Sequence, residues 1–340
     1  MAKTALITGV SGQDGAYLAK LLLEKGYAVH GTVRRHGQFS QQRLIELGIV
    51  DKVAIHDLEL LEITNIQRVI AEVVPDEIYN FAAQSFVAKS FVQPIHTASI
   101  DGLGPLRILE ALRGLGAKSR FYQASTSEMF GNVELAPQDE NTPFHPRSPY
   151  AIAKLFAHWM TVNYRDAYGV HASSGISFNH ESPLRGTEFV TRKISYGLAR
   201  IKRGLQESIA LGNLDSARDW GFAGDYVAGM WAMLQRPEPD DYVLASGEAH
   251  TVREFVERCG EALGMKIVWK GSGSAEIGVD DRTGQTVIKL DSQFLRPADV
   301  NRLIGNSQKA HKVLGWRPSV GFEELVRMMA KGDYDRCKVP

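Results

Sequence analysis

The chain has 340 residues, of which 44% are apolar and 23% charged, a balance typical of a folded globular protein with one large or two moderate domains. Lysine plus arginine and aspartate plus glutamate both number 39, so no overall charge favours nucleic acid or an anionic membrane as a partner. Two distant cysteines, Cys259 and Cys337, argue against a disulfide framework or a zinc site, and no apolar run reaches the ~20 residues of a membrane span.

The first predicted elements are a strand over residues 4–8, a glycine turn, and a helix that stops before Gly26. The turn places Gly9, Gly12 and Gly15 at three-residue spacing in the run Gly-Val-Ser-Gly-Gln-Asp-Gly. Glycines let the backbone approach a pyrophosphate, and the start of the helix offers its free N–H groups to the phosphates. The pattern therefore predicts a dinucleotide site. The same stretch lacks the apolar core of a signal peptide, so we expect a cytoplasmic protein.

A second predicted strand, residues 28–33, ends in Arg34 and Arg35. An enzyme that uses NAD carries an acidic residue about 20 positions after the glycines, where it holds the ribose 2′-hydroxyl. Arginine at this position suits the 2′-phosphate instead, so the sequence favours NADP over NAD. Two solvated arginines without a ligand are the alternative. Residues 38–47 are expected to form a loop that enters a short helix.

Two more strand ends are expected to line the cofactor. A short strand over 53–55 precedes Asp57 and Leu58, which are placed to contact an adenine edge. A strand over 77–81 leads into Ala82-Ala-Gln84-Ser85, where small residues would let the nicotinamide half lie close to the backbone. The helices predicted between the strands cover residues 63–74 and 94–115, the second with its pattern interrupted by Gly102, Gly104 and Pro105.

The fifth predicted strand, residues 120–124, delivers a hydroxyl pair and a carboxylate: Thr126, Ser127 and Glu128. A helix then begins at Pro149 and carries Tyr150 and Lys154, which share a face because they are four residues apart. A free phenol titrates near ~10, and a neighbouring ammonium lowers that pKa, which makes Tyr150 a candidate acid and base. Strands and helices in alternation predict a doubly wound parallel α/β sheet, whose catalytic groups gather at strand ends.

In the second half of the chain the alternation loosens. A sixth strand over 170–177 ends in the polar run 178–183, and a helix over 189–203 presents a basic face. Further helices are predicted at 226–234, 251–263 (opened by a capping box at Thr251 and Glu254), 307–314 and 322–330, with a strand at 242–245. Residues 271–285, rich in Gly, Ser, Asp and Glu, are expected to be a mobile or hairpin-forming insertion. Trp159 and Trp220 are expected in the core.

Together these motifs closely resemble the extended short-chain dehydrogenase/reductase superfamily and, within it, the GDP-mannose 4,6-dehydratase family. The resemblance covers nearly the whole chain and is most specific at 9–15, 34–35, 122–128, 146–154, 178–183, 189–193 and 218–220. It implies a Rossmann domain for NADP over 1–178, joined by returning segments at about 214–246 and 291–306. It also implies a smaller α/β domain for the nucleotide sugar over 179–213, 247–290 and 307–340. The family forms homodimers or homotetramers, in which the Tyr150 helix and the 94–115 helix of two copies pair.

The resemblance implies a lyase that converts GDP-α-D-mannose to GDP-4-dehydro-6-deoxy-α-D-mannose, the first step toward GDP-fucose, GDP-rhamnose or related deoxyhexoses. Tyr150 would take the O4 proton while NADP+ takes the C4 hydride, and Lys154 would lower the pKa of Tyr150 and hold the nicotinamide ribose. Glu128 would remove the C5 proton and protonate the departing O6 hydroxyl, before the hydride returns to C6. Thr126 would bond O4, and Ser127 would orient O6 and the carboxylate.

The family motifs also imply contact residues, and they imply no metal. For the cofactor these are Gly9, Gly12, Gln13, Asp14, Gly15, Arg34, Arg35, Asp57, Leu58, Ala82, Gln84, Ser85, Tyr150, Lys154 and His180. For the substrate they are Ser85, Glu128, Asn179, Lys193, Gly212, Arg218, Arg296 and Asp299. A carboxylate at Asp299 could accept two hydrogen bonds from guanine, although the family often has glutamate there. For Arg296 and Asp299 the alternative is an ordinary surface pair, and for His180 and Glu181 it is support of the loop.

Three other functions fit parts of this pattern. A nucleotide-sugar reductase or epimerase on the same scaffold would share Tyr150 and Lys154 but would not need Glu128. A dehydratase for a dTDP- or UDP-hexose usually has aspartate before the catalytic glutamate, where this chain has Ser127. A catalytically idle NADP-binding sensor or scaffold would have no physical need of the complete set of Thr126, Glu128, Tyr150 and Lys154.

Overall fold

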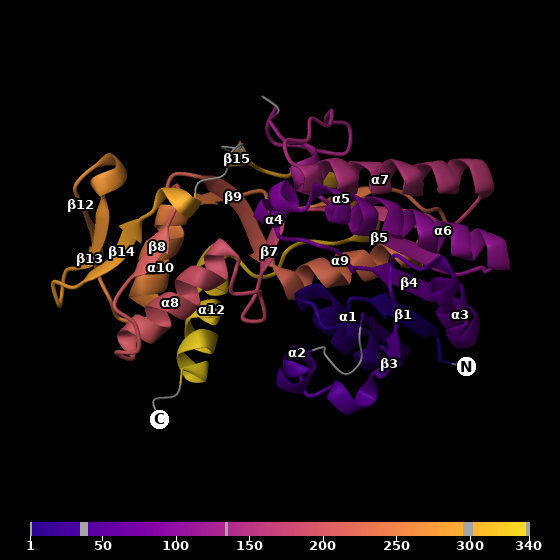
Figure 1. Cartoon of the computed structure of the whole chain (residues 1–340), viewed down its shortest axis with the longest axis horizontal. Helices are drawn as coiled ribbons and strands as arrows, with labels where there is room; N and C mark the ends of the chain where they lie inside the picture. The colour runs from indigo at the N-terminus through magenta and orange to yellow at the C-terminus, as the bar shows by residue number, and fades with distance from the viewer. Residues whose placement is uncertain (1, 35–39, 133–134, 295–301, 338–340) are drawn as a thin grey trace.

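A computed structural model describes residues 2–34, 40–132, 135–294 and 302–337 (Figure 1). Arg35, Arg296 and Asp299, which were predicted to bind ligands, lie outside these residues. The molecule is elongated, with the large sheet and its helices in one half and a group of shorter strands and further helices in the other (Figure 1). No helix in the described part of the chain is both long and apolar enough to cross a membrane.

The central sheet has seven parallel strands in the order β10-β6-β5-β4-β1-β2-β3. Their bounds are β1 (Thr4–Thr8), β2 (Ala28–Val33), β3 (Ala54–Asp57), β4 (Glu77–Asn80), β5 (Arg120–Thr126), β6 (Ala172–Ser177) and β10 (Tyr242–Leu244). The predicted doubly wound sheet is therefore confirmed. The strand order reverses between β1 and β4, and ligands of such sheets bind at that point, beyond the carboxyl ends of the strands.

Helices cover both faces of this sheet. Leu6 and Ile7 show how adjacent strand residues feed two separate cores, because successive side chains point to opposite faces. One core is covered by α1 (Gln13–Glu24), α2 (Gln42–Glu46), α9 (Ala223–Gln235) and α11 (Gln308–Leu314). The other is covered by α3 (Ile63–Val73), α6 (Leu103–Leu115) and α7 (Pro149–Tyr168). The short helix predicted before residue 47 is α2.

The prediction of a single long helix over residues 94–115 is wrong. The segment is divided into α5 (Pro94–Thr97), a π turn η3 (Ala98–Gly102) and α6, and an unpredicted helix α4 (Val87–Val92) comes before it. Pro105 explains the break, because proline has no N–H to give to the carbonyl of Asp101 and its ring crowds that carbonyl. The wider π turn absorbs this conflict.

The remaining strands form two small sheets. One has the order β12-β13-β14-β8 and the other β11-β9-β15, with β7 also pairing β9. Their bounds are β12 (Ile267–Lys270), β13 (Ile277–Asp280), β14 (Thr286–Leu290), β8 (Ile209–Leu211), β11 (Ala249–Thr251), β9 (Ala217–Phe222), β15 (Arg302–Leu303) and β7 (Asn179–Glu181). The 271–285 insertion supplies β13 and the turn into β14, so its interpretation as a hairpin is confirmed.

Three helices, α8 (Val190–Lys202), α10 (Val252–Ala262) and α12 (Phe322–Arg336), pack on these strands around a third core. Thr251 and Glu254 form the predicted capping box at the start of α10. Trp220 is buried in this core, as expected. Trp159 is 55% exposed, so its assignment to the core is wrong. Short 3₁₀ turns complete the fold: η2 (Val50–Lys52), η4 (Ser127–Met129), η5 (Gly273–Ala275) and η6 (Ser292–Phe294).

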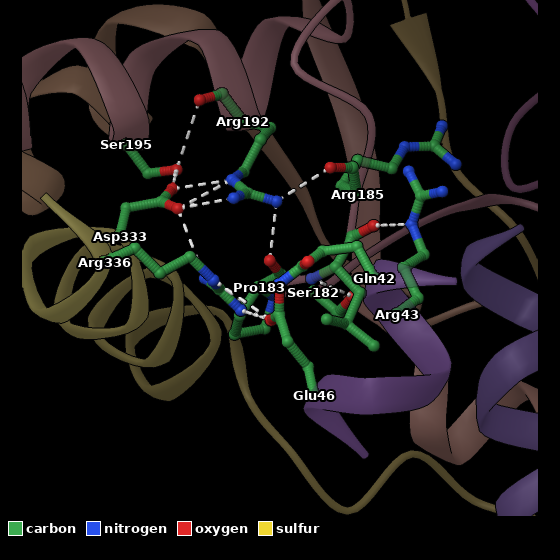
Figure 2. Close-up of polar contacts among 11 residues, drawn as sticks. Gln42, Arg43, Glu46, Ser182, Pro183, Arg185, Arg192, Ser195, Asp333 and Arg336 are labelled. Carbon is green, nitrogen blue, oxygen red and sulfur yellow. Dashed lines mark hydrogen bonds and ion pairs between the residues drawn. The ribbon is translucent and has the colours of Figure 1, made fainter. Parts of the chain in front are cut away.

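A buried network of charges, which we call the junction network, links the two halves of the molecule (Figure 2). At its centre the guanidinium of Arg192 on α8 donates from Nε to both carboxylate oxygens of Asp333 on α12, at 2.8 Å each. Asp333 also accepts from Ser195 Oγ at 2.6 Å and from Arg336 Nη1 at 3.3 Å. Arg336 then reaches across to Glu46 on α2.

Candidate active site

The site is built where β5 ends and α7 begins. Thr126 is the last residue of β5, and its Oγ1 accepts the N–H of Glu128 at 3.2 Å, which turns the chain into η4. The start of α7 is fixed by Ser148, whose hydroxyl accepts the N–H of Ala151 at 3.1 Å, and by Pro149 in the first helical turn. Tyr150 follows directly and is brought to the end of the sheet.

Tyr150 is buried, and burial is the main cause that raises its pKa above the ordinary value; the charges of Asp101 and Glu128 add to this. A hydrogen bond from the Thr126 hydroxyl acts in the opposite direction. The structure thus brings Thr126, Glu128 and Tyr150 together, as the sequence predicted. It does not confirm a lowered pKa for Tyr150: burial outweighs any effect of Lys154, whose Nζ lies 5.9 Å from the centroid of the tyrosine ring.

Lys154 lies one turn further along α7, as predicted, and its side chain is buried. Its Nζ donates a 3.0 Å hydrogen bond to the carbonyl of Ala124 in β5. Burial lowers the pKa of Lys154, while the carboxylates of Asp101 and Asp14 oppose that shift. The ammonium is therefore held against the sheet by one carbonyl and two acidic groups.

The sequence interpretation missed two charged residues of this cluster. Asp101, 1% exposed in the π turn, acts electrostatically on both Tyr150 and Lys154. Arg185 contacts Glu181 at 3.1 Å and lowers the pKa values of Tyr150 and Asp14. Asp101 left a signal, because a carboxylate within an otherwise apolar helical pattern needs a reason to be there. For Arg185 the position directly after the polar run 178–183 was the available signal.

The glycine turn has the close contacts that a phosphate-binding loop requires. Gly9 has φ +70°, and a Cβ on it would lie 3.0 Å from the backbone nitrogen of Ala82. A Cβ on Gly15 would lie 2.5 Å from the carbonyl oxygen of Gly9. Side chains at these positions would push the turn away from α1 and β4, so the bare backbone at the start of α1 depends on glycine.

Gln13, Asp14 and His180, all predicted to contact the cofactor, form a bridge between α1 and β7. Asp14 Oδ2 lies 2.9 Å from His180 Nε2, and Gln13 Nε2 donates to the carbonyl of His180 at 3.0 Å. Gln13 Oε1 accepts from the Ser182 hydroxyl at 2.7 Å. Burial raises the pKa of Asp14, but the charge of His180 and hydrogen bonds lower it to about 2. The contacts agree with the loop-support alternative, and cofactor contact by these residues stays a prediction.

The predicted adenine contacts lie at the neighbouring ends of β2 and β3. Val33 pairs with Asp57 across these strands, and its carbonyl accepts the N–H of Leu58 at 2.9 Å. Arg34 and Asp57 are exposed there, whereas Leu58 is buried. Strand β3 begins and ends later than predicted, so Asp57 is its last residue instead of following it.

The predicted nicotinamide contacts follow β4. The N–H of Ala82 donates to Thr8 Oγ1 at 3.1 Å, which ties this loop to β1. Gln84 donates its backbone N–H to Asp101 Oδ1 at 2.7 Å, and Ser85 is exposed next to it. The loop after β4 is thus held to the glycine side by Thr8 and to the catalytic side by Asp101.

Two predicted substrate residues lie on paired strands. Asn179 in β7 pairs with Trp220 in β9, two residues from Arg218. Arg218 is buried and donates from Nη1 to the Ala217 carbonyl at 2.9 Å. Its neighbour Asp219 accepts hydrogen bonds from the backbones of residues 246, 247 and 305 at 2.8, 2.9 and 3.1 Å, and so fixes the strand that carries Arg218.

Two other predicted substrate residues, Lys193 and Gly212, lie next to Phe294, which with Lys193 lines a hollow of about 240 Å³. Lys193 lies on its wall with the Nζ 3.2 Å from the ring centroid of Phe294, and burial lowers the pKa of Lys193. A Cβ on Gly212 would lie 2.7 Å from the carbonyl oxygen of Phe294, so only glycine lets the backbone at residue 212 lie this close to Phe294. The other residues of the wall are Thr187, Tyr196, Gly197, Gln206, Ser208, Ile209 and Ala210. Phe294, which the sequence interpretation missed, organises this group.

Among the residues that the structure describes, no group of three or more His, Cys, Asp and Glu side chains is placed to hold a metal ion. The two cysteines are free and buried.

Comparison with known proteins agrees with this geometry. The sequence matches the model of a family described as GDP-mannose 4,6 dehydratase over residues 6–329. A GDP-mannose 4,6-dehydratase from Sinorhizobium fredii is 51% identical over 338 residues, which cover 97% of this chain and 96% of the relative. Among solved structures, RMD from Pseudomonas aeruginosa complexed with NADPH has a TM-score of 0.76 at 24% identity, covering 98% of this chain and 100% of that one. The dTDP-glucose 4,6-dehydratase DesIV from Streptomyces venezuelae, with NAD bound, has a TM-score of 0.82 at 20% identity, covering 98% and 97%. At these identities the two structures show a shared fold.

Proposed function

The chain belongs to the GDP-mannose 4,6-dehydratase family, and from this premise we propose how its residues divide the reaction. The enzyme is a lyase that dehydrates GDP-mannose to GDP-4-dehydro-6-deoxy-mannose, at the entry to deoxyhexose synthesis. The observation that carries the assignment of roles is the cluster at the end of β5, where Thr126, Glu128 and Tyr150 interact with one another. A reductase or epimerase on this scaffold would have no use for the carboxylate beside that tyrosine.

Tyr150 is the base that takes the proton from O4 of the hexose. The Thr126 hydroxyl, which already bonds Tyr150, stabilises the phenolate as it forms. Lys154, held by the Ala124 carbonyl, keeps a positive charge beside the developing anion. Ser127, buried with no partner for its hydroxyl oxygen among the described residues, orients the O6 side of the sugar.

Glu128 then acts twice. The ketone at C4 acidifies the proton on C5, which the Glu128 carboxylate removes. The same group, now a carboxylic acid, protonates the O6 hydroxyl as it leaves. General acid and base steps of this kind contribute about 10²–10⁴-fold each. Glu128 lies in η4, two residues after Thr126. From this position it acts on C5, the carbon next to the C4 that faces Tyr150.

The cofactor site fits a nicotinamide dinucleotide, because side chains at Gly9 and Gly15 would meet backbone atoms and displace the turn whose bare backbone would approach the pyrophosphate. NADP is the form that Arg34 and Arg35 favour, together with Asp57 and Leu58 at the adenine end. A cofactor held there would supply the hydride acceptor for C4 and the hydride donor for C6. Residues 1–178, 214–246 and 291–306 are the segments assigned to this half of the protein, with Ala82, Gln84 and Ser85 at the nicotinamide end.

The other segments, 179–213, 247–290 and 307–340, are assigned to the nucleotide sugar. Arg218 and Lys193 supply cations for the diphosphate. Asn179 and Ser85 hold the sugar, and the hollow lined by Phe294, with Gly212 beside that residue, receives the nucleotide. Arg296 and Asp299 are assigned to the guanine end, where a carboxylate can accept the two N–H groups that uracil and thymine lack.

Two copies are expected to pair through α7 and the helices beside it. Ile152, Phe156 and Trp159 on α7 are 57%, 42% and 55% exposed, and Ile95 on α5 is 80% exposed. An apolar strip of this kind on a catalytic helix suits a homodimer interface, which can be doubled into a tetramer. The two free thiols fit the reducing cytoplasm.

A panel of nucleotide sugars with mass detection tests the function. GDP-mannose should lose the mass of one water without accumulation of NADPH, and hydrogen labelled at C4 should appear in the new methyl group. Loss of water from a dTDP- or UDP-hexose instead would favour the alternative dehydratases, and turnover without water loss would favour a reductase or epimerase.

Replacing Glu128 by glutamine tests its role. E128Q should still take the C4 hydride, seen as a transient absorbance of reduced nicotinamide, but should form product about 10²-fold or more slowly. Tight NADP binding with no turnover of any nucleotide sugar by the wild type would point to the idle sensor.

A further inference from the structure

Three polar side chains, which we call the polar row, cross the middle of the central sheet near its carboxyl edge. Thr8 in β1 pairs with Asn80 in β4, and Asn80 pairs with Gln123 in β5, so the three side chains lie on one face of adjacent strands. Each is at most 1% exposed. Two residues earlier, the same strands carry on this face an apolar row, as expected of a buried parallel sheet. The apolar row consists of Leu6, Ile78 and Phe121.

Hydrogen bonds join the polar row to the candidate active site. The Thr8 hydroxyl donates to Asn80 Oδ1 at 2.6 Å, and Asn80 Nδ2 donates to Gln123 Oε1 at 2.9 Å. Gln123 Nε2 then donates to the carbonyl of Ala124 at 3.0 Å. Lys154 Nζ donates to the same carbonyl, also at 3.0 Å. One end of the polar row therefore shares its acceptor with the buried ammonium of α7.

The other end of the polar row holds the loop that follows β4. Thr8 Oγ1 accepts the backbone N–H groups of Phe81 and Ala82, each at 3.1 Å. This loop is assigned to the nicotinamide end of the cofactor, and Lys154 is assigned to the nicotinamide ribose. An unbroken chain of hydrogen bonds thus links the two parts of the protein that are assigned to the same half of the cofactor.

The donors and acceptors of this chain have a fixed direction. The Thr8 oxygen already accepts two N–H groups, so its single hydrogen is left for Asn80 Oδ1. The amide nitrogen of Asn80 must then face Gln123, and the amide nitrogen of Gln123 must face Ala124. A backbone carbonyl has two lone pairs. Because Gln123 occupies one side of the Ala124 carbonyl, the ammonium of Lys154 is restricted to the other side.

Packing alone does not explain amides at these positions. A buried amide costs free energy unless it is hydrogen-bonded, and a pair of apolar side chains of the same shape is often equally stable. The apolar row on the same strands shows that this face accepts aliphatic and aromatic side chains. Fully bonded polar networks in a core fix one arrangement of the groups that they connect.

We propose that Asn80 and Gln123 are positioning residues, which hold the Lys154 ammonium at a fixed place relative to the loop after β4. This inference rests on the proposed function, in which Lys154 holds the nicotinamide ribose and keeps a positive charge beside Tyr150. Gln123 acts by occupying one side of the Ala124 carbonyl. Asn80 acts by keeping the Gln123 amide in the orientation that donates to this carbonyl.

Crystal structures of variants test the geometry without turnover. Gln123→Met removes the amide but keeps a side chain of similar length, and Asn80→Leu removes the group that orients the amide. In both variants Lys154 Nζ should move by about 1 Å or more, a displacement that matters for catalysis. The matched control is Tyr79→Phe, which removes a buried 2.8 Å hydrogen bond to Glu77 Oε2 from the same strand β4. Lys154 should keep its place in Y79F.

Turnover of GDP-mannose tests the consequence. In N80L and Q123M, kcat should fall at least about 10-fold with KM changed less than about 3-fold, because the ammonium is misplaced beside the reacting groups. Y79F should keep kcat within about 2-fold of the wild type. In the E128Q background, reduced nicotinamide should appear more slowly by a similar factor when N80L or Q123M is added. A wild-type rate in these variants would overturn the proposal.

The double variant N80L/Q123M separates positioning from structural support. It leaves neither amide unpaired, so it should regain most of the thermal stability that either single variant loses, but it should not regain kcat. Recovery of both would show that the polar row only satisfies its own hydrogen bonds, and it would overturn the proposal.

The two readouts also separate this inference from the proposed function. Displacement of Lys154 in variants of a protein that leaves GDP-mannose unchanged would refute only the function. An unmoved Lys154 in both N80L and Q123M would overturn the inference even if the wild type dehydrates GDP-mannose.

Discussion

Charged side chains are buried in two regions of the protein, and the hydrogen bonding of the buried carboxylates differs between the two. In the junction network, both oxygens of Asp333 are bonded, by Arg192, Ser195 and Arg336 (Figure 2). In the candidate catalytic cluster, Asp101 has one oxygen bonded, and the other has no hydrogen-bond partner in the part of the chain that the structure describes. Burial raises the pKa of both aspartates, so the two sites differ in hydrogen bonding and not in exposure.

This difference separates structural from functional charge. A buried ion pair with all its partners contributes little net stability over an apolar pair, but the loss of one partner leaves an uncompensated charge. A buried carboxylate with a free oxygen lowers stability outright and is retained where it has work to do. Substitutions in the junction network should therefore change stability, and substitutions in the catalytic cluster should change turnover.

The largest effect is expected from Tyr150→Phe. Removing the hydroxyl that we propose takes the O4 proton should lower kcat by about 10²–10⁴-fold, because a general base of this kind contributes that much to the rate. Stability should change by no more than about 1 kcal/mol, the value of one hydrogen bond. Product formation and thermal unfolding of the same preparation measure both. A mild loss of turnover would mean that another base serves O4.

Next in size is Asp333→Asn, which belongs to the other region. The guanidinium of Arg192 would stay buried without its counter-charge, so we expect a loss of about 3–5 kcal/mol in the free energy of unfolding. Denaturant titration measures it. The double variant Arg192→Met, Asp333→Leu is the control and should recover most of the loss. Equal instability of the double variant would show that the network stabilises the fold by more than its charge balance.

Asp101→Asn should move stability in the opposite direction. Because its pKa is raised from 3.8 to about 6 in the folded protein, the ionised form is disfavoured there. The wild type should therefore lose stability as the pH rises from about 4 to about 6, by up to about 3 kcal/mol relative to D101N. Unfolding curves of both proteins across this pH range test the sign. A variant that is less stable than the wild type at pH 7 would contradict the comparison.

The smallest effect is expected at the rim of the junction network. Burial acts to raise the pKa of Glu46, but the hydrogen bond from Arg336 lowers it overall. The pair is partly exposed, so Glu46→Gln should reduce stability by only about 0.5 kcal/mol. The difference should shrink in high salt and in acid, once the pH falls through the lowered pKa of Glu46 and the carboxylate loses its charge. A loss of stability as large as that of D333N would show that the partly exposed pair of Glu46 and Arg336 stabilises the fold as much as the buried pair of Arg192 and Asp333.

Most of the large sheet could be predicted from the sequence, because its strands and helices carry local patterns. The bounds of β2 and the start of α7 agree with the prediction, because Arg34 directly after β2 and Pro149 at the start of α7 are local signals in the sequence. The short strands β7, β8 and β9 were not predicted. Each is formed by partners distant in sequence, such as β8 with β14, so no local pattern shows them.

The grouping of Thr126, Glu128, Tyr150 and Lys154 could be predicted from the sequence, because these residues lie in two compact motifs; their catalytic roles stay a prediction. Asp101 was missed, since its role depends on a π turn that Pro105 imposes four residues later. The raised pKa of Tyr150 could not be predicted from the sequence either, because it depends on how deeply the phenol is buried. Trp159 was misplaced for a related reason: an apolar residue at helical spacing gives no information on which side of the helix lies outside.

That outward tryptophan has a practical consequence. Trp159 lies on the same helix as Tyr150 but is more than half exposed, whereas Trp220 is enclosed in the other half of the molecule. Of the five tryptophans Trp159 is the most exposed, so fluorescence that shifts to the blue as the protein is concentrated, and that no longer does so in Trp159→Phe, would come from the outer side of α7. Trp159 therefore reports, by its fluorescence, whether another chain covers the outer side of α7.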